Sequence, residues 1–63
     1  MTESEKRICD DVLRYGTIKT DIEFRNNNLE LIRQYVIELD NEEYHMTKID
    51  GEWSYFHHCI KAS

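Results

Sequence analysis

The residue types best able to do chemistry gather in one stretch, HMTKIDGEWSYFHHC, residues 45–59. His57, His58 and Cys59 are adjacent there, and His45 opens the stretch. Imidazole nitrogen and thiolate sulfur are common zinc ligands, and a Cys–His pair can also act as a nucleophile and its base. The stretch therefore raises two chemical hypotheses, metal binding and catalysis.

Metal binding can be examined through strand geometry. If residues 52–60 form a strand, His57 and Cys59 point to one face and His58 to the other, because successive side chains alternate. Cys9 could approach His57 and Cys59 if a helix covers their face, which would give three ligands. The sequence contains neither a C-x2-C nor an H-x3-H pair, so the spacing supports this site weakly. We therefore expect no metal and no cofactor, and a small metal-binding protein using these residues is kept as an alternative.

Catalysis has less support than metal binding. The adjacent carboxylates Asp10–Asp11 and Glu42–Glu43 would diverge on a helix or in a turn. Gly16 and Gly51 stand too far apart to form a phosphate-binding loop. A chain of 63 residues also offers little room for an enclosed substrate pocket. We expect that the protein is not an enzyme.

The charge of the chain bears on its partners. Asp and Glu number 13 against 8 Lys and Arg, which gives a formal net charge of −5. No basic cluster exceeds Lys6–Arg7, so we expect no direct binding to nucleic acid, which requires clustered cations. An acidic surface suits solubility or a basic partner. An acidic inhibitor that mimics nucleic acid is therefore a further alternative.

Length and composition predict one small domain, residues 1–63. The start, MTESEKR, lacks the apolar stretch of a signal peptide, and no run approaches the ~18 apolar residues of a membrane span. We expect a cytoplasmic protein, not associated with membranes, whose Cys9 and Cys59 stay reduced. Its size and acidity also suit the small regulators and inhibitors encoded by phages and mobile elements.

Apolar spacing predicts an N-terminal helix followed by strands. The helix is capped by Thr2 or Ser4 and ends at Gly16, a natural residue after a helix C-terminus. Its apolar stripe consists of Ile8, Cys9, Val12, Leu13 and Tyr15. From residue 17 to 25 the apolar period changes to two, which is typical of a half-buried strand. Residues 29–39 fit either a strand or a helix.

Turn positions favour the strand interpretation of residues 29–39. With two-residue turns at Asn26–Asn27, Asp40–Asn41 and Asp50–Gly51, opposite residues in the hairpins share a face and the apolar sets coincide. That predicted core face carries Ile18, Ile22, Phe24, Leu29, Leu31, Tyr35, Ile37, Leu39, Tyr44, Met46, Trp53 and Tyr55. We therefore predict an α+β fold, with the N-terminal helix packed on one face of a four-stranded antiparallel β-meander.

The other face of the predicted sheet should be polar, yet uncharged side chains gather at its centre. They are Ile32, Val36, His45, Ile49 and Phe56. A gathered patch of this kind indicates an interface, whereas scattered apolar residues do not. The alternatives are a merely tolerated patch and a patch covered by the C-terminal tail IKAS, residues 60–63. The sequence thus predicts a small acidic, non-enzymatic protein–protein interaction or regulatory module that binds a protein partner, most simply as a homodimer.

Overall fold

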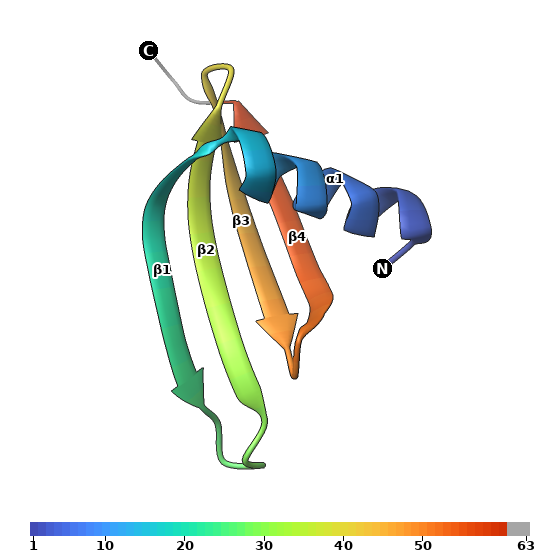
Figure 1. Ribbon diagram of the computed structural model, residues 1–63, viewed down its shortest axis with the longest axis vertical. Coiled ribbons are helices and arrows are strands. Elements are labelled where there is room, and N and C mark those ends of the chain that lie inside the picture. The colour runs from blue at the N-terminus through green and yellow to red at the C-terminus, as the bar shows by residue number, and fades with distance from the viewer. Residues whose placement is uncertain (61–63) are drawn as a thin grey trace.

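The computed structural model describes residues 1–60, which form one helix followed by four strands. The elements are α1 (Glu3–Tyr15), β1 (Thr17–Arg25), β2 (Leu31–Leu39), β3 (Glu42–Ile49) and β4 (Glu52–Ile60). The strands form an antiparallel sheet in the order β1-β2-β3-β4, and α1 lies across one of its faces (Figure 1). This confirms the predicted α+β meander, with Leu31–Leu39 as a strand rather than a helix.

The helix begins with a reciprocal cap. The Thr2 hydroxyl oxygen accepts a hydrogen bond from the Glu5 backbone N–H at 3.1 Å, and the Glu5 carboxylate accepts one from the Thr2 N–H at 3.0 Å. Both bonds satisfy N–H groups that a helix start would otherwise leave without a partner. Of the two caps predicted, Thr2 is therefore the one used.

Gly16 ends the helix for a reason other than the one expected. A glycine after a helix usually takes a left-handed conformation, but Gly16 has φ −82° and ψ 172°, which is extended backbone. A Cβ atom at this position would overlap the Cγ2 of Ile37 and the carbonyl oxygen of Val12. Glycine is required because the chain passes directly against β2 as it turns from α1 into β1.

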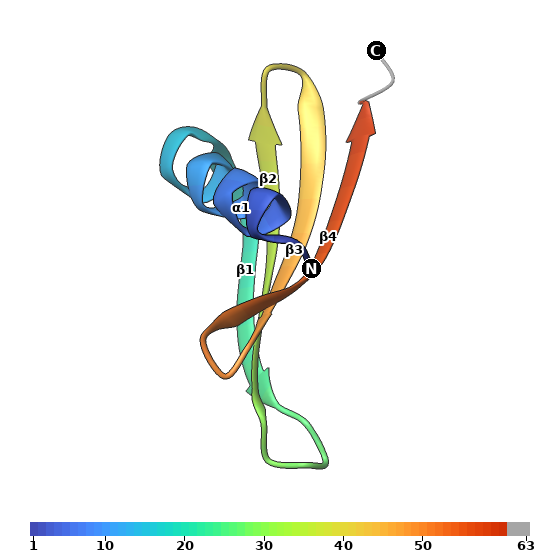
Figure 2. The same cartoon turned by 90° about the vertical axis from the view of Figure 1, so that its right-hand side faces the viewer.

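The core lies between α1 and the sheet. Cys9 and Val12 point down from the helix onto residues of the three strands β2, β3 and β4. The buried cluster consists of Cys9, Val12, Tyr35, Ile37, Met46 and Trp53, with Leu13, Leu39, Tyr44 and Phe56 packed against it. Among residues 1–60, α1 covers the half of the sheet near the β2–β3 turn, on one side only (Figures 1 and 2). The core is consequently small and one-sided.

Two of the three turns have the predicted form. Asp40 and Asn41 have φ of 54° and 64°, and Asp50 and Gly51 have φ of 50° and 85°. Positive φ at both central residues is the mark of a two-residue hairpin turn whose twist matches the strands. The register of β2 on β3 follows, with Tyr35 opposite Met46 as predicted.

The predicted turn between β1 and β2 is wrong. Residues 26–30 form a longer loop, in which the Asn26 side-chain oxygen accepts hydrogen bonds from the N–H of Asn28 and of Glu30, at 2.9 and 3.0 Å. Leu29 completes the loop with φ of 62°. The longer loop is closed by an Asx turn at Asn26. Asparagine favours both this turn and a two-residue turn, so residue propensity does not distinguish them.

The longer loop moves β1 by an odd number of residues relative to β2. Phe24 lies opposite Ile32, not Leu29, and Ile22 lies opposite Gln34. An odd shift sends a strand's side chains to the other face of the sheet. Ile22 and Phe24 therefore lie on the face away from α1, and their predicted place in the core is wrong. Past an irregularity between Ile18 and Thr20, Ile18 lies opposite Ile37 on the helix side.

A second reversal occurs in β4. Lys48 lies opposite Trp53 as predicted, but the register then shifts, so that Thr47 lies opposite Tyr55 and Met46 opposite Phe56. This bulge adds one residue to β4, and every side chain after it changes face. It lets Trp53 and Phe56 both pack on the core, where strict alternation would have placed Tyr55. The predictions that Tyr55 faces the helix and Phe56 faces away are both wrong.

Candidate protein-interaction surface

The face of the sheet away from α1, which we call the open face, is built from three cross-strand rows. The first row contains Phe24, Ile32, Ile49 and Glu52, and the second contains Ile22, Gln34, Thr47 and Tyr55. The third row contains Thr20, Val36, His45 and His57. Among residues 1–60, no helix or strand covers this face (Figure 2). Each row begins at β1 and ends at β4.

The apolar residues of the open face concentrate toward β1. Ile22 and Phe24 remain 50% and 45% exposed, although both are large and apolar. Ile32 is only 6% exposed, because its neighbours in the first row, Phe24 and Ile49, flank it on both sides. We call Ile22, Phe24, Ile32, Val36 and Ile49 the open-face patch. It extends from the edge strand to the middle of the sheet.

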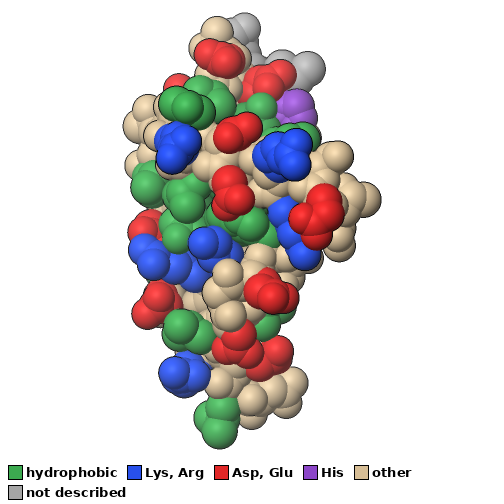
Figure 3. Space-filling view, turned by 45° about the vertical axis from the view of Figure 1, so that its right-hand side comes forward, with side chains coloured by type: hydrophobic (Ala, Val, Ile, Leu, Met, Phe, Trp, Pro, Cys, Tyr) green, Lys and Arg blue, Asp and Glu red, His purple; other side chains and the backbone are tan. Residues whose placement is uncertain are grey.

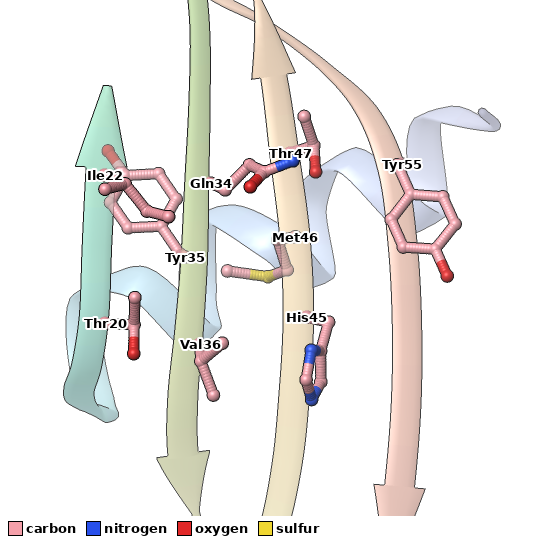
Figure 4. A pocket seen from close by; sticks show the side chains of 9 residues that line it. All are labelled: Thr20, Ile22, Gln34, Tyr35, Val36, His45, Met46, Thr47 and Tyr55. Carbon is pink, nitrogen blue, oxygen red and sulfur yellow. The ribbon is translucent and has the colours of Figure 1, made fainter. Parts of the chain in front are cut away.

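A shallow hollow of about 190 Å³ lies in the second and third rows. Figure 4 views it with α1 behind the strands, and shows His45, Thr20 and Val36 on one side of it and Tyr55 toward the outer strand. It is lined by Thr20, Ile22, Gln34, Tyr35, Val36, His45, Met46, Thr47 and Tyr55. Hydroxyl, amide and imidazole groups mixed with aliphatic side chains suit a polar side chain of a docked protein. The hollow is open, which is unlike the enclosed cavities that bind most small ligands.

His45 joins the patch to the charged margin of the face. Its Nε2 lies 2.8 Å from a carboxylate oxygen of Glu43, and its ring meets that of His57 edge-on, with the two centroids 6.3 Å apart. Glu43 in turn lies opposite Cys59 on the neighbouring strand. The polar end of the open face is thus a set of mutually contacting side chains next to the β2–β3 turn.

The candidate metal ligands do not converge. His57 and Cys59 lie on the open face, because the bulge reverses β4, so their predicted orientation toward the helix is wrong. Cys9 is buried in the core on the opposite side of the sheet. Within residues 1–60, no group of three or more His, Cys, Asp or Glu side chains is placed to hold a metal ion. The sheet itself separates Cys9 from the other two.

Burial also changes the chemistry of the Cys9 thiol. Burial, together with the charges of Asp10 and Glu5, raises the pKa of Cys9 to about 11. The thiolate is the form that attacks electrophiles and binds metals. Cys9 is therefore an inert core residue. Cys59 is half-buried.

On the helix side of the sheet, the part that α1 leaves uncovered is less apolar than the open face. Arg33 donates two hydrogen bonds to the Asp21 carboxylate, at 2.9 and 2.8 Å, and these lower the pKa of Asp21. The Arg33 guanidinium lies 5.3 Å from the ring centre of Tyr35, and the Lys48 ammonium 4.6 Å from that of Trp53. Cations thus cover the aromatic rings that α1 leaves uncovered. Figure 3 shows basic and acidic side chains interspersed on this side.

The structure removes one residue from the predicted interface set and adds others to it. Ile32, Val36, His45 and Ile49 lie on the open face as predicted, whereas Phe56 packs against the core. Ile22, Phe24 and Tyr55, which the sequence pattern had assigned to the core face, occupy the open face instead. The third asparagine in the run 26–28 was the available signal, since it left room for a longer loop.

Comparison of the chain with protein-family models, with curated proteins and with solved structures finds no match. The helix of the described residues, α1, is neither long nor apolar enough to cross a membrane.

Proposed function

We propose that this protein is a small, non-enzymatic protein-interaction module that self-associates, most simply as a two-fold homodimer, through the open-face patch. The observation that carries the proposal is the position of Ile22 and Phe24, which are half exposed on a strand whose nine residues are all exposed. Apolar side chains gathered at one place on a surface otherwise rich in charge mark interaction sites. A two-fold dimer needs only one self-complementary patch.

The small core supports the proposal. The buried side chains of residues 1–59 are few: Cys9, Val12, Ile32, Tyr35, Ile37, Met46 and Trp53. A domain of 63 residues buries only ~60% of the surface that its unfolded chain exposes, so its stability margin is thin. Oligomerisation is a common way for chains of this size to gain stability. Each large apolar side chain newly buried contributes up to ~1.5–3 kcal/mol.

The distribution of charge is compatible with self-association despite the net charge of −5. The acidic side chains of the open face, which include Glu38, Glu43 and Glu52, stand at its two ends, in the outer positions of β2, β3 and β4. The patch between them is uncharged. Two copies can therefore bring their patches together while the carboxylates stay in water, where salt screens them.

Sedimentation equilibrium over a range of concentrations tests the proposal. We expect the wild type to form dimers, and the double variant Ile22→Glu/Phe24→Glu to remain a folded monomer by circular dichroism. The matched control is Ile8→Glu/Tyr15→Glu, which adds the same two charges at exposed apolar positions of α1. It should dimerise like the wild type. A wild type that is monomeric at the highest attainable concentration would contradict the proposal.

A further inference from the structure

We infer that the second copy joins along β1, antiparallel and edge to edge with Glu23 on the two-fold axis, so that two four-stranded sheets become one continuous sheet. This inference rests on the self-association proposed above and narrows the contact to the margin of the open-face patch in β1, at Ile22 and Phe24. The outer edge of β1 then pairs with the same edge of a second copy.

The edge is open along most of its length. Within residues 1–60, β1 pairs with β2 alone, and the register from Thr20 to Arg25 is regular. Edge strands present a row of N–H and C=O groups that can pair with another chain, and proteins usually guard them with bulges, proline or inward-pointing charges. The opposite edge strand, β4, has such a bulge near Ser54. The regular part of β1 has neither a bulge nor a proline, and the charges that it carries, on Asp21, Glu23 and Arg25, are of both signs.

The hydrogen-bonding groups that face outward can be assigned from the loop. The Asn26 N–H donates to the Glu30 carbonyl oxygen at 3.1 Å, which makes these two residues a hydrogen-bonded pair at the end of the hairpin. Such pairs recur at every second residue of an antiparallel ladder. The main-chain groups of the even-numbered residues therefore point to β2, and those of Asp21, Glu23 and Arg25 point to the free edge.

Charge complementarity selects the register. With Glu23 on the axis, Asp21 of each copy lies opposite Arg25 of the other, which gives two opposite-charge pairs. With Ile22 on the axis, Asp21 would lie opposite Glu23 twice, and like charges directly opposite are unfavourable. An axis at Asp21 would carry the ladder into the irregularity between Ile18 and Thr20. An axis at Phe24 would also give two opposite-charge pairs, Glu23 with Arg25, but it would pair only residues 23–25 of each copy, because β1 ends at Arg25. The register with Glu23 on the axis pairs residues 21–25 and is thus favoured, with the two Glu23 side chains meeting on the axis.

Each Glu23 carboxylate already has a cation nearby. The Arg33 Nη1 lies 3.9 Å from its Oε2, and the two residues are opposite each other in the β1–β2 ladder. This contact reduces, without removing, the repulsion between the two Glu23 side chains. The axis is therefore the weak point of the register, which makes Glu23 the most informative residue to change.

The same register matches the apolar side chains. Ile22 of one copy lies opposite Phe24 of the other on the open face, and the pair occurs twice by symmetry. Aromatic and β-branched residues form favourable cross-strand pairs. Ile22 and Phe24, which are half exposed in the single copy, would cover one another. Both faces of β1 thus favour one register, and the two open-face patches merge into one apolar band.

Cross-linking with a short bismaleimide tests the geometry, in the Cys59→Ser background so that buried Cys9 is the only native cysteine left. Glu23→Cys should couple efficiently to its copy. Thr47→Cys, at the centre of the open face, should not, whereas it would couple in a face-to-face dimer. Glu52→Cys, exposed on β4, measures coupling by random collision.

The outcomes separate this inference from the proposed function. Dimeric mass with coupling at Glu23→Cys supports both. Dimeric mass without coupling at Glu23→Cys overturns edge pairing and leaves self-association standing, and coupling at Thr47→Cys would then identify a face-to-face dimer. A wild type that stays monomeric overturns both.

Two further variants of Glu23 separate the edge from a general effect on folding. Glu23→Pro removes only an outward-facing N–H, which edge strands tolerate, so the chain should stay folded but become monomeric. Glu23→Gln removes the like-charge contact on the axis and should tighten the dimer by about two- to fivefold. Equal dimerisation of wild type and Glu23→Pro would overturn the inference.

Discussion

The Asp10 carboxylate of α1 accepts a hydrogen bond from the indole N–H of Trp53 in β4, with 2.7 Å between Oδ1 and Nε1. The two residues are far apart in sequence, and Trp53 belongs to the buried cluster. The bond satisfies the polar atom of a side chain that is only 7% exposed. It also fixes the helix to the edge strand most distant from β1.

Replacing Asp10 should therefore destabilise the fold. Asp10→Ala leaves the indole N–H without its acceptor, and hydrogen bonds to a charged group contribute about 1.5–3 kcal/mol. Asp11→Ala, at the exposed neighbouring position, is the control and should change stability by no more than ~0.5 kcal/mol. Urea unfolding followed by tryptophan fluorescence measures both. Equal effects would show that the bond contributes nothing specific.

The close passage of the chain at Gly16 predicts a steric effect. Gly16→Ala should lower the free energy of unfolding by about 1–3 kcal/mol, because the added methyl group overlaps Ile37 and the Val12 carbonyl. Gly51→Ala is the comparison. It has no atom within 4 Å of the added group, but its φ of +85° is strained for alanine. We expect its cost to be nearer 1 kcal/mol. A harmless Gly16→Ala would contradict the contact.

The buried thiol predicts a loss of stability at alkaline pH. The pKa of Cys9 is raised from 9.0 to about 11 in the folded chain, so the unfolded chain loses this proton first. Stability should be fully retained below pH 9 and should fall between pH 9 and about 11. Burial also raises the pKa of Tyr35 and of Tyr44 above 10.0, so these side chains act in the same direction from about pH 10 upward.

The Cys9→Ala variant isolates this contribution. Its free energy of unfolding, measured by urea at a series of pH values, should begin to fall only where the tyrosines titrate. The difference between wild type and variant should therefore shrink as the pH rises above 9. A constant difference over the whole range would mean that Cys9 does not titrate with unfolding.

The bulge in β4 predicts opposite outcomes for two neighbouring aromatic residues. Phe56→Ala should destabilise the chain by at least about 2 kcal/mol, since Phe56 packs against the buried cluster. Tyr55→Ala should cost much less, because Tyr55 is 53% exposed on the open face. Thermal unfolding of the two variants compares them directly. The reverse order would mean that β4 continues without a bulge.

Elements and buried helix residues could be predicted from the sequence because each leaves a local signal. The stripe at Cys9 and Val12, the alternation in residues 17–25 and the Asp50–Gly51 turn depend only on neighbours along the chain. The register of β2 on β3 followed from such a turn. Tyr35, Ile37, Met46 and Trp53 were therefore assigned to the correct face.

The open face could not be predicted in full. The face to which a strand residue points depends on whether the number of residues in the preceding turn or bulge is odd or even. The Asx turn at Asn26 and the bulge near Ser54 each change that count, and neither is marked by residue type alone. One reversal moved Ile22 and Phe24 onto the open face, and the other moved Phe56 off it. A sequence can thus predict all four strands correctly and still assign many side chains of β1 and β4 to the wrong face of the sheet.

Most strands must both stabilise the fold and present side chains for binding. The exposure of all nine residues of β1 separates these two demands. A substitution in a buried strand is judged first by its effect on folding, so few such changes can be tried without loss of the native state. At the solvent-facing positions of β1, folding places little restriction on the choice of side chain. New affinities can therefore be selected or engineered at Ile22, Glu23 and Phe24 while the helix and the other strands keep the sequence that holds them together.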